Sequence, residues 1–114
     1  MKKIILILMT IILCTFSDGV FANSLAKGEE LYQRCVSCHG DKAQGNDMLK
    51  APSLAGQKQW YVERQLNNFI DGIRGANPKD TYGLMMRPMA LGLSGESDVS
   101  DISAYISSLS LNSE

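Results

Sequence analysis

The chain has 114 residues, 45% of them hydrophobic, and carries 11 Lys plus Arg against 12 Asp plus Glu, for a formal net charge of −1. This length allows one domain with a modest core. The nearly balanced charge, without a long run of one sign, argues against nucleic-acid binding and is too mild to indicate a strongly charged partner.

The N-terminal segment has the pattern of a cleaved signal peptide. A basic start at residues 1–3 precedes an apolar run over residues 4–16, and residues 20–22 offer small enough side chains at the two positions that a signal peptidase reads. We predict cleavage after Ala22, export to the periplasm and a mature domain of residues 23–114. The apolar run has about thirteen residues, fewer than the ~20 of a membrane span, so a retained anchor is the alternative.

The first helix of the mature domain is predicted to follow Ser24, a suitable N-cap, and to run for about eleven residues. Gly28 in its interior costs roughly 1 kcal/mol of helix propensity relative to Ala, so we expect another helix to approach closely there. One face of the helix carries residues at helical spacing: Leu25, Gly28, Leu31, Tyr32 and Cys35.

Residues 35–39, Cys-Val-Ser-Cys-His, have the C-x-x-C-H pattern of covalent c-type haem attachment. Two thiols three positions apart lie on one side of a helical turn, so each can form a thioether with one vinyl group of the same porphyrin. His39, next to Cys38, is then positioned to bind the iron. We therefore predict one covalent haem c, held by Cys35 and Cys38, and a poorly folded apo-protein, because so small a domain needs this group to pack against.

Two other uses of a C-x-x-C pair fit the sequence less well. A thioredoxin-like redox pair would need a βαβ pattern around it, which the sequence does not have. A zinc site would need more Cys or His ligands, but the chain has one His, and its third cysteine, Cys14, lies in the predicted signal peptide.

Residues 40–58 are predicted to form a loop on the His39 side of the haem, because Gly45, Pro52 and Gly56 interrupt any helical pattern. The carbonyl oxygen of Pro52 could accept a hydrogen bond from the second ring nitrogen of His39, as ligating histidines generally require. A simple turn proline is the alternative interpretation of Pro52.

A second helix is predicted from about Gln59 to Ile73, with apolar residues repeating every three or four positions. Trp60 and Tyr61 at its start are predicted to pack against the haem or the core.

Residues 75–92 are predicted to form an irregular loop that contains Met85, Met86 and Met89. On a helix face such a cluster would usually fill gaps in a core. In an irregular segment downstream of a haem-binding histidine, it favours a thioether as the second axial ligand of the iron. No second His in the chain competes for that position.

The last helix is predicted to take Ser94 as its N-cap, with carboxylates such as Asp98 in its first turn, near the positive end of the helix dipole. We expect it to pack against the first helix, with Tyr105 against Gly28 and Tyr32. Its apolar stripe consists of Val99, Ile102, Tyr105, Ile106 and Leu109.

Together these features resemble class I cytochromes c, in particular the short bacterial monohaem type called cytochrome c-553 and the repeats of di-haem cytochromes c. The resemblance covers nearly all of residues 23–114. It rests on residues 28–32 before the C-x-x-C-H motif, residues 51–57 and 60–61 after it, residues 86–94 and residues 104–106.

The resemblance implies an all-α fold in which the N- and C-terminal helices cross and shorter helices and loops wrap one haem c. It also implies that the carbonyl of Pro52 orients His39. In this family the distal methionine precedes the serine of the last helix by eight positions, which selects Met86 as the second iron ligand, with Met89 or Met85 as alternatives.

The function implied by the resemblance is that of a monomeric periplasmic carrier of single electrons and not of an enzyme, because a six-coordinate iron leaves no position for a substrate. Its partners would be redox proteins met transiently: a dehydrogenase or reductase donor and an oxidase or reductase acceptor. The alternatives are a haem subunit held permanently in a periplasmic oxidoreductase complex, and a gas-binding haem protein with an open sixth position.

Overall fold

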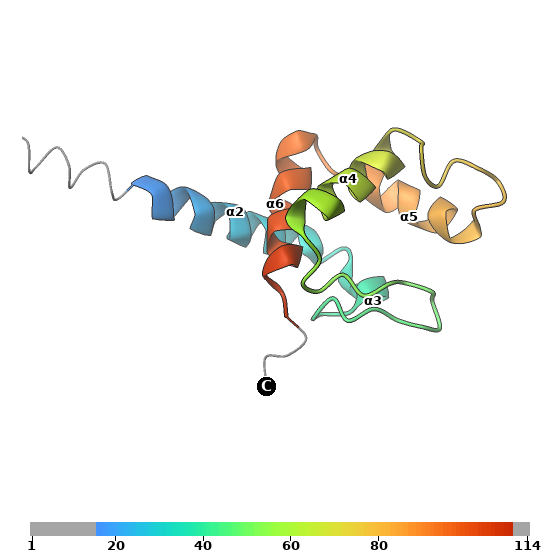
Figure 1. Ribbon diagram of the computed structural model, residues 1–114, viewed down its shortest axis with the longest axis horizontal. Coiled ribbons are helices and arrows are strands. Elements are labelled where there is room, and N and C mark those ends of the chain that lie inside the picture. Colours follow the sequence, from blue (N-terminus) through green and yellow to red (C-terminus); the bar gives the residue numbers. More distant parts are fainter. Residues whose placement is uncertain (1–15, 111–114) are drawn as a thin grey trace, which may run out of the picture.

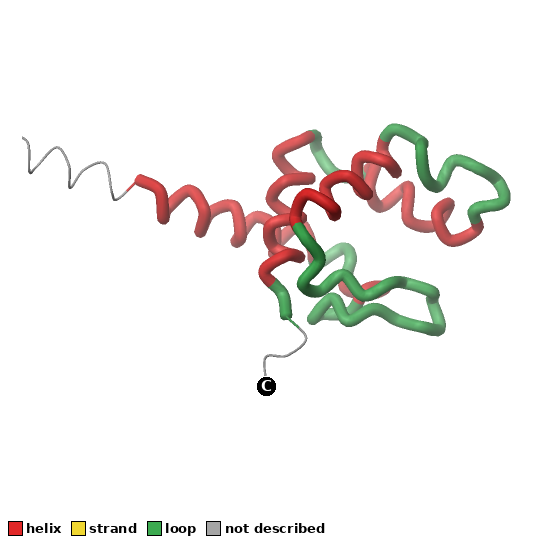
Figure 2. Tube along the Cα trace, in the orientation of Figure 1, coloured by secondary structure: helices red, strands yellow, loops and turns green. Residues whose placement is uncertain are grey.

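The computed structural model describes residues 16–110 of the chain. In this part the regular structure consists of helices: α2 (Phe16–Tyr32), α3 (Val36–His39), α4 (Gln59–Ile70), α5 (Thr81–Leu91) and α6 (Glu96–Ser108), which are drawn in Figure 1 and Figure 2. The loops of the same residues add one isolated antiparallel bridge, between Asn46 and Ala51. The predicted all-α fold is confirmed.

The predicted signal peptide lies mostly in residues 1–15, outside the described residues, as do residues 111–114. Residues 16–22 form the start of α2, so the predicted cleavage after Ala22 would fall inside that helix. Ser24 is therefore not the N-cap of a helix in the full-length chain; its hydroxyl donates a hydrogen bond to the carboxylate of Asp101 in α6. Between residues 16 and 110, no helix combines the length and apolar composition needed to cross a membrane.

The N- and C-terminal helices cross, as predicted: α6 lies against the C-terminal half of α2, while the start of α2 projects beyond the rest of the molecule (Figure 1). The crossing point is Gly28. A Cβ atom there would lie 2.7 Å from the Cβ of Tyr105 and would also overlap the carbonyl oxygen of Asp101. Tyr105 also contacts Tyr32, with 5.5 Å between the ring centroids. The predicted contact of Tyr105 with Gly28 and Tyr32 is confirmed.

Replacing Gly28 with alanine is expected to destabilise the protein by about 1–3 kcal/mol, the usual range for overpacking, although alanine favours a helix by roughly 1 kcal/mol. The added methyl group would meet backbone of α6, which cannot move aside without separating the helices. The midpoint of urea unfolding of the haem-loaded protein measures the change.

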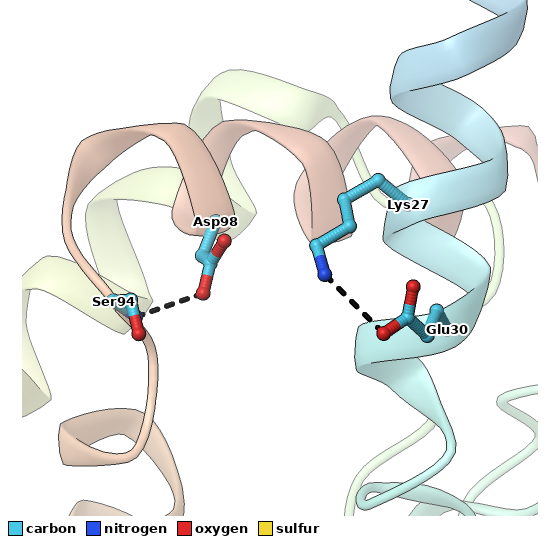
Figure 3. Close-up of polar contacts among 4 residues, drawn as sticks. All are labelled: Lys27, Glu30, Ser94 and Asp98. Carbon is cyan, nitrogen blue, oxygen red and sulfur yellow. Dashed lines mark hydrogen bonds and ion pairs between the residues drawn. The ribbon is translucent and has the colours of Figure 1, made fainter.

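Lys27→Ala is the matched control, because Lys27 is adjacent on α2 and forms only an exposed ion pair with Glu30, at 3.3 Å (Figure 3). An exposed pair contributes about 0–1 kcal/mol, so this variant should unfold near the wild-type midpoint. A Gly28→Ala protein as stable as wild type would show that the two helices are farther apart than the structure places them.

The start of α6 differs from the prediction in one residue. Gly95, with φ of +88°, occupies the N-cap position in place of Ser94 and offers no side-chain cap. The carboxylate of Asp98 instead accepts a hydrogen bond from the backbone N–H of Ser94, at 2.9 Å (Figure 3). The predicted acidic first turn is present, since Glu96 and Asp98 both lie in it.

The core forms where α2, α4, α5 and α6 meet, and α4 packs against both α5 and α6. The predicted stripe of α6 faces this core, with Tyr105 and Leu109 half-buried at its margin. The second predicted helix is confirmed as α4, but it ends at Ile70, three residues earlier than predicted, where Asp71 forms the C-cap. The buried apolar side chains of the core cluster are Tyr32, Ala43, Val62, Leu66, Phe69, Ala90, Val99, Ile102 and Ile106.

The prediction that residues 75–92 form an irregular loop was wrong for its second half, which is helix α5. Asp80 caps this helix by accepting a hydrogen bond from the backbone N–H of Gly83. Pro88 lies inside α5 and removes one hydrogen bond from its ladder. The helix persists because its buried face, including Gly83 and Ala90, packs against the rest of the core. The methionines are therefore helical residues.

Candidate functional site

A mostly apolar cavity of about 660 Å³ opens between α3, the loop 40–58, α4, α5 and the core face of α6. Its volume lies within the range of about 300–1,000 Å³ that is usual for sites that bind small molecules and cofactors. The predicted site residues that lie on its wall are Cys35, Cys38, His39, Pro52, Tyr61, Met85, Met86 and Met89.

The two thiols line the cavity from the short helix α3, which contains Cys38, and from its N-cap residue, Cys35. The backbone N–H of His39 donates to the carbonyl of Cys35, at 2.9 Å, which closes one helical turn and brings Cys35, Cys38 and His39 to the same wall. Cys35 is half-buried and Cys38 is exposed.

The Cys35 thiol is held neutral by its surroundings. Burial raises its pKa to about 11, and the neighbouring Cys38 adds to the rise while Arg34 opposes it. Cysteines that act in redox exchange have lowered pKa values, because the thiolate is their reactive form. The shift at Cys35 has the opposite direction.

His39 is buried, with 6% of its surface exposed, and its ring is fixed by Pro52. Nδ1 donates a hydrogen bond to the Pro52 carbonyl oxygen, at 2.9 Å. Because a carbonyl oxygen can only accept, Nδ1 carries the proton and Nε2 keeps its lone pair for a metal. The predicted hydrogen bond is therefore present in the structure.

The loop 40–58 brings Pro52 to His39 through a tight turn at Gly45. The backbone N–H of Gly45 donates to the carbonyl of His39, at 2.8 Å. Gly45 has φ of +85°, and a Cβ atom there would lie 2.6 Å from the backbone nitrogen of Ser53. Glycine is thus required for the loop to return close enough for the Pro52 carbonyl to meet the imidazole.

Tyr32 links α2 to the residue after the motif. Its ring is fully buried, and its hydroxyl donates a hydrogen bond to the carbonyl of Gly40, at 2.7 Å. Burial is the main cause of a raised pKa for this phenol, and the nearby Cys35 and Tyr105 add to it. Burial also raises the pKa of Tyr105. Both phenols therefore stay neutral in the folded protein to a higher pH than a free tyrosine would.

The protein is expected to lose stability as the pH rises above 10, the usual pKa of tyrosine. The raised pKa means that the folded state keeps the Tyr32 proton while the unfolded state releases it, so the contribution is complete below pH 10 and declines above it. Tyr32→Phe should lower the free energy of unfolding at neutral pH by about 0.5–1.5 kcal/mol and make the decline above pH 10 shallower. Urea unfolding at several pH values measures both effects, and an unchanged decline would contradict the assignment.

The three methionines differ in exposure along α5. Met86 is half-buried and packs against the core cluster, whereas Met85 is 59% exposed and Met89 is 38% exposed. Met86 and Met89 are three positions apart on the helix and so share a face. His39 and Met86 line the same cavity, and thioether sulfur is a soft ligand that suits haem iron. Burial favours Met86 over the other two.

The two aromatic residues at the start of α4 differ in their position relative to the cavity. Tyr61 lines the cavity and is 41% exposed, whereas Trp60 is 57% exposed and lies outside the cavity wall. Arg64 stacks over the Trp60 ring, 4.9 Å from its centroid. The prediction that Trp60 packs against the haem or the core is corrected: Trp60 is a surface residue, because it lies on the outer side of the first turn of α4.

Several other wall residues were not predicted from the sequence. Arg34, Gln65, Arg74 and Tyr82 line the cavity, yet none belongs to a motif. Their positions depend on how α4, α5 and the segment after α2 pack together, and no local sequence pattern reports that arrangement.

The residues of this cavity fit a covalently held haem. Two thiols lie on one wall, one imidazole has its Nδ1 proton engaged, and most of the remaining lining side chains are apolar or aromatic. A flat apolar cofactor would bury its faces against Leu66, Phe69 and Ile102, and its iron would face nitrogen and sulfur ligands.

A sequence model of the family described as cytochrome c matches residues 25–110, which include the whole cavity. The chain belongs to the cytochrome c family. It is 41% identical over 87 residues to cytochrome c-554(548) of Halomonas halodenitrificans, which covers 76% of this chain and 98% of that protein. It is 39% identical over 93 residues to cytochrome c-554(547) of Halothiobacillus neapolitanus, with 77% and 99% covered.

Longer cytochromes c match over only part of their length. The chain is 35% identical over 91 residues to cytochrome c4 of Azotobacter vinelandii, a match that covers 72% of this chain but 41% of that protein. Membership of the cytochrome c family confirms three predictions from the sequence: the resemblance to class I cytochromes c, the covalent haem c and the role of electron carrier. Membership of this family supports the prediction that the protein is an electron carrier and not an enzyme.

Proposed function

We propose that this cytochrome c is a periplasmic carrier of single electrons whose iron is ligated by His39 and Met86. The observation that carries the proposal is that a buried imidazole, with Nδ1 donating to Pro52, shares one cavity with the half-buried thioether of Met86. Cys35 and Cys38 hold the haem as thioethers.

When bound, the haem supplies a couple of ferric and ferrous iron that accepts and releases one electron. The protein's residues keep that exchange free of other chemistry. His39 is fixed in one tautomer and one orientation by Pro52, and Met86 occupies the position where a substrate would otherwise bind. The apolar wall excludes water and disfavours the more highly charged ferric state, as does Met/His ligation.

Electrons would enter and leave through the side of the cavity that reaches solvent. Leu49, Tyr82 and Met85 line the cavity and are 42%, 56% and 59% exposed. A small apolar rim of this kind suits the brief contacts of redox partners, whose interfaces bury less area than those of stable complexes. This arrangement supports a carrier that acts as a monomer and exchanges partners.

One relative indicates the class of redox partner. A relative in Stutzerimonas stutzeri, called a thiosulfate dehydrogenase electron acceptor, is 36% identical over 76 residues, which cover 65% of this chain and 35% of that protein. By analogy, we propose that the donor of this protein is a dehydrogenase or reductase and the acceptor another redox protein. The signal peptide of residues 1–22 would deliver it to the periplasm.

Absorption spectra of the reduced protein with and without carbon monoxide test the proposal. With both axial positions filled, the spectrum should not change on rapid mixing at neutral pH, and the ferric protein should show the sulfur-to-iron charge-transfer band. Rapid binding of carbon monoxide would show an open position and favour a gas-binding protein. The mass of the exported holoprotein, expected to begin at Asn23, checks the cleavage site.

A further inference from the structure

Three cationic side chains line the cavity although it is mostly apolar: Arg34, Lys50 and Arg74. Asp80 is the one carboxylate among the lining residues, and its two oxygens accept hydrogen bonds from the backbone N–H groups of Gly75 and Gly83. Within residues 16–110 the structure has one ion pair, between Lys27 and Glu30, and neither residue lines the cavity. The cations of the cavity therefore have no carboxylate partner supplied by the described part of the chain.

Arg74 is the most firmly held of the three. Its Nη1 donates a hydrogen bond to Oε1 of Gln65, at 2.6 Å, and its Cζ lies 4.5 Å from the centroid of the Phe69 ring. Its backbone N–H donates to the carbonyl of Asn68, at 2.9 Å. Gln65 and Phe69 are themselves wall residues on α4, so the guanidinium is fixed at the edge of the cavity before any ligand arrives.

The turn that carries Arg74 is built to hold this position. Gly72 and Gly75 have φ of +74° and +72°, which fold the chain back onto the end of α4. A Cβ atom at Gly75 would overlap the carbonyl of Gly83 at the start of α5. Figure 1 shows this connection between α4 and α5 projecting away from the crossing of α2 and α6.

We propose that Arg74, held by Gln65 and Phe69, binds a propionate group of the haem. A haem carries two carboxylates on an otherwise apolar ring, and a carboxylate at the edge of an apolar cavity must be solvated or paired. The planar guanidinium offers two parallel N–H groups to a carboxylate. Arg74 is exposed, so it lies at the rim, where solvent also reaches the carboxylate.

Arg34 and Lys50 fit this role less well. Arg34 adjoins Cys35, which binds a vinyl group, and in the porphyrin the vinyl groups and the propionates occupy opposite edges. Its Nη1 also donates to the carbonyl of Gly92, at 2.6 Å. Lys50 presents a point charge on a flexible stem and cannot form the two parallel hydrogen bonds.

Arg74→Gln in the holoprotein tests the inference, with two readouts. Loss of the guanidinium leaves the propionate charge uncompensated, which stabilises ferric iron and lowers the equilibrium constant for reduction by about three- to tenfold, a tenfold change being 59 mV for one electron. The propionate bending band in the resonance Raman spectrum should shift. Arg74→Lys should keep most of the potential but still shift the band.

Arg64→Gln is the matched control, because Arg64 has the same charge and also stacks on an aromatic ring, yet lies outside the cavity wall. It should leave the band in place and change the equilibrium constant by less than twofold. Gln65→Ala removes the hydrogen bond that holds Arg74 and should give a smaller shift in the same direction. If the Arg74→Gln protein does not fold, the propionate band of Gln65→Ala tests the inference in its place.

The inference is overturned if Arg74→Gln matches Arg64→Gln in potential and both Arg74→Gln and Gln65→Ala keep the wild-type propionate band. It rests on the haem site but not on the proposed axial ligands. The charge-transfer band of the same samples reports Met86 separately, so a failure of the ligand assignment would be visible in the wild-type protein while the propionate readouts remain valid.

Discussion

A Met86→Ala protein is expected to lose the sulfur-to-iron charge-transfer band, to bind carbon monoxide rapidly when reduced, and to have a lower reduction potential. Axial ligands set haem potentials over a span of about 0.8 V, and loss of a methionine removes the ligand that favours ferrous iron, so a fall on the order of 0.1 V or more is expected. Absorption spectroscopy and a potentiometric titration of the holoprotein measure these changes.

Met85→Ala and Met89→Ala are the controls, since both residues lie on the same helix and line the same cavity. Met85 is 59% exposed and Met89 38% exposed, so each substitution creates little buried void. Both proteins should keep the band and a potential near that of wild type. If the band survives in Met86→Ala and disappears in Met89→Ala, the ligand is Met89, one helical turn away on the same face.

A protein in which both Cys35 and Cys38 are replaced by alanine is expected to carry no covalent haem and to be poorly folded. Without the cofactor, the mostly apolar walls of this cavity, about 660 Å³ in volume, would be exposed to water. A typical domain is stable by only about 5–15 kcal/mol, so loss of the contacts with the cofactor is expected to unfold much of the protein. The core face of α6, including Ile102 and Ile106, would lose its partner.

Haem staining after denaturing electrophoresis and far-ultraviolet circular dichroism measure these two effects. Cys14→Ala is the matched control: Cys14 is the remaining cysteine of the chain and lies in the predicted signal peptide, so the variant should be loaded and folded like wild type. A double variant with wild-type helix content and no bound haem would show that the helices assemble without the cofactor.

The attachment site was predictable from local sequence because its chemistry is local. The C-x-x-C-H spacing places two thiols and one imidazole on a single helical turn, whatever surrounds it, and α3 has that geometry. Likewise Gly28 signalled a close helix crossing, since a glycine that weakens a helix interior needs a compensating contact, and Tyr105 supplies it.

Helix boundaries were less predictable because they depend on the neighbouring structure. Ser24 and Ser94 both have the side chain of an N-cap, but Ser24 lies within a longer helix and Gly95 takes the cap position of α6. Helix α5 was not predicted because it contains Gly83 and Pro88, two residues of low helix propensity. It is stabilised more by packing of its buried face and by the Asp80 cap than by its intrinsic propensity.

The sequence by itself determined the covalent chemistry: it predicted one haem c, the two thiols proposed to hold it, and the one histidine and few methionines that could ligate its iron. The tertiary structure decided which other residues share the cavity with His39. It buried Met86 more than its neighbours, left Trp60 on the surface and brought Arg74 from a glycine-rich turn to the wall. The reason is physical: the spacing of a motif fixes side chains within one turn of a helix, whereas the walls of a cavity come from elements far apart in the chain, whose relative placement depends on how their buried faces pack.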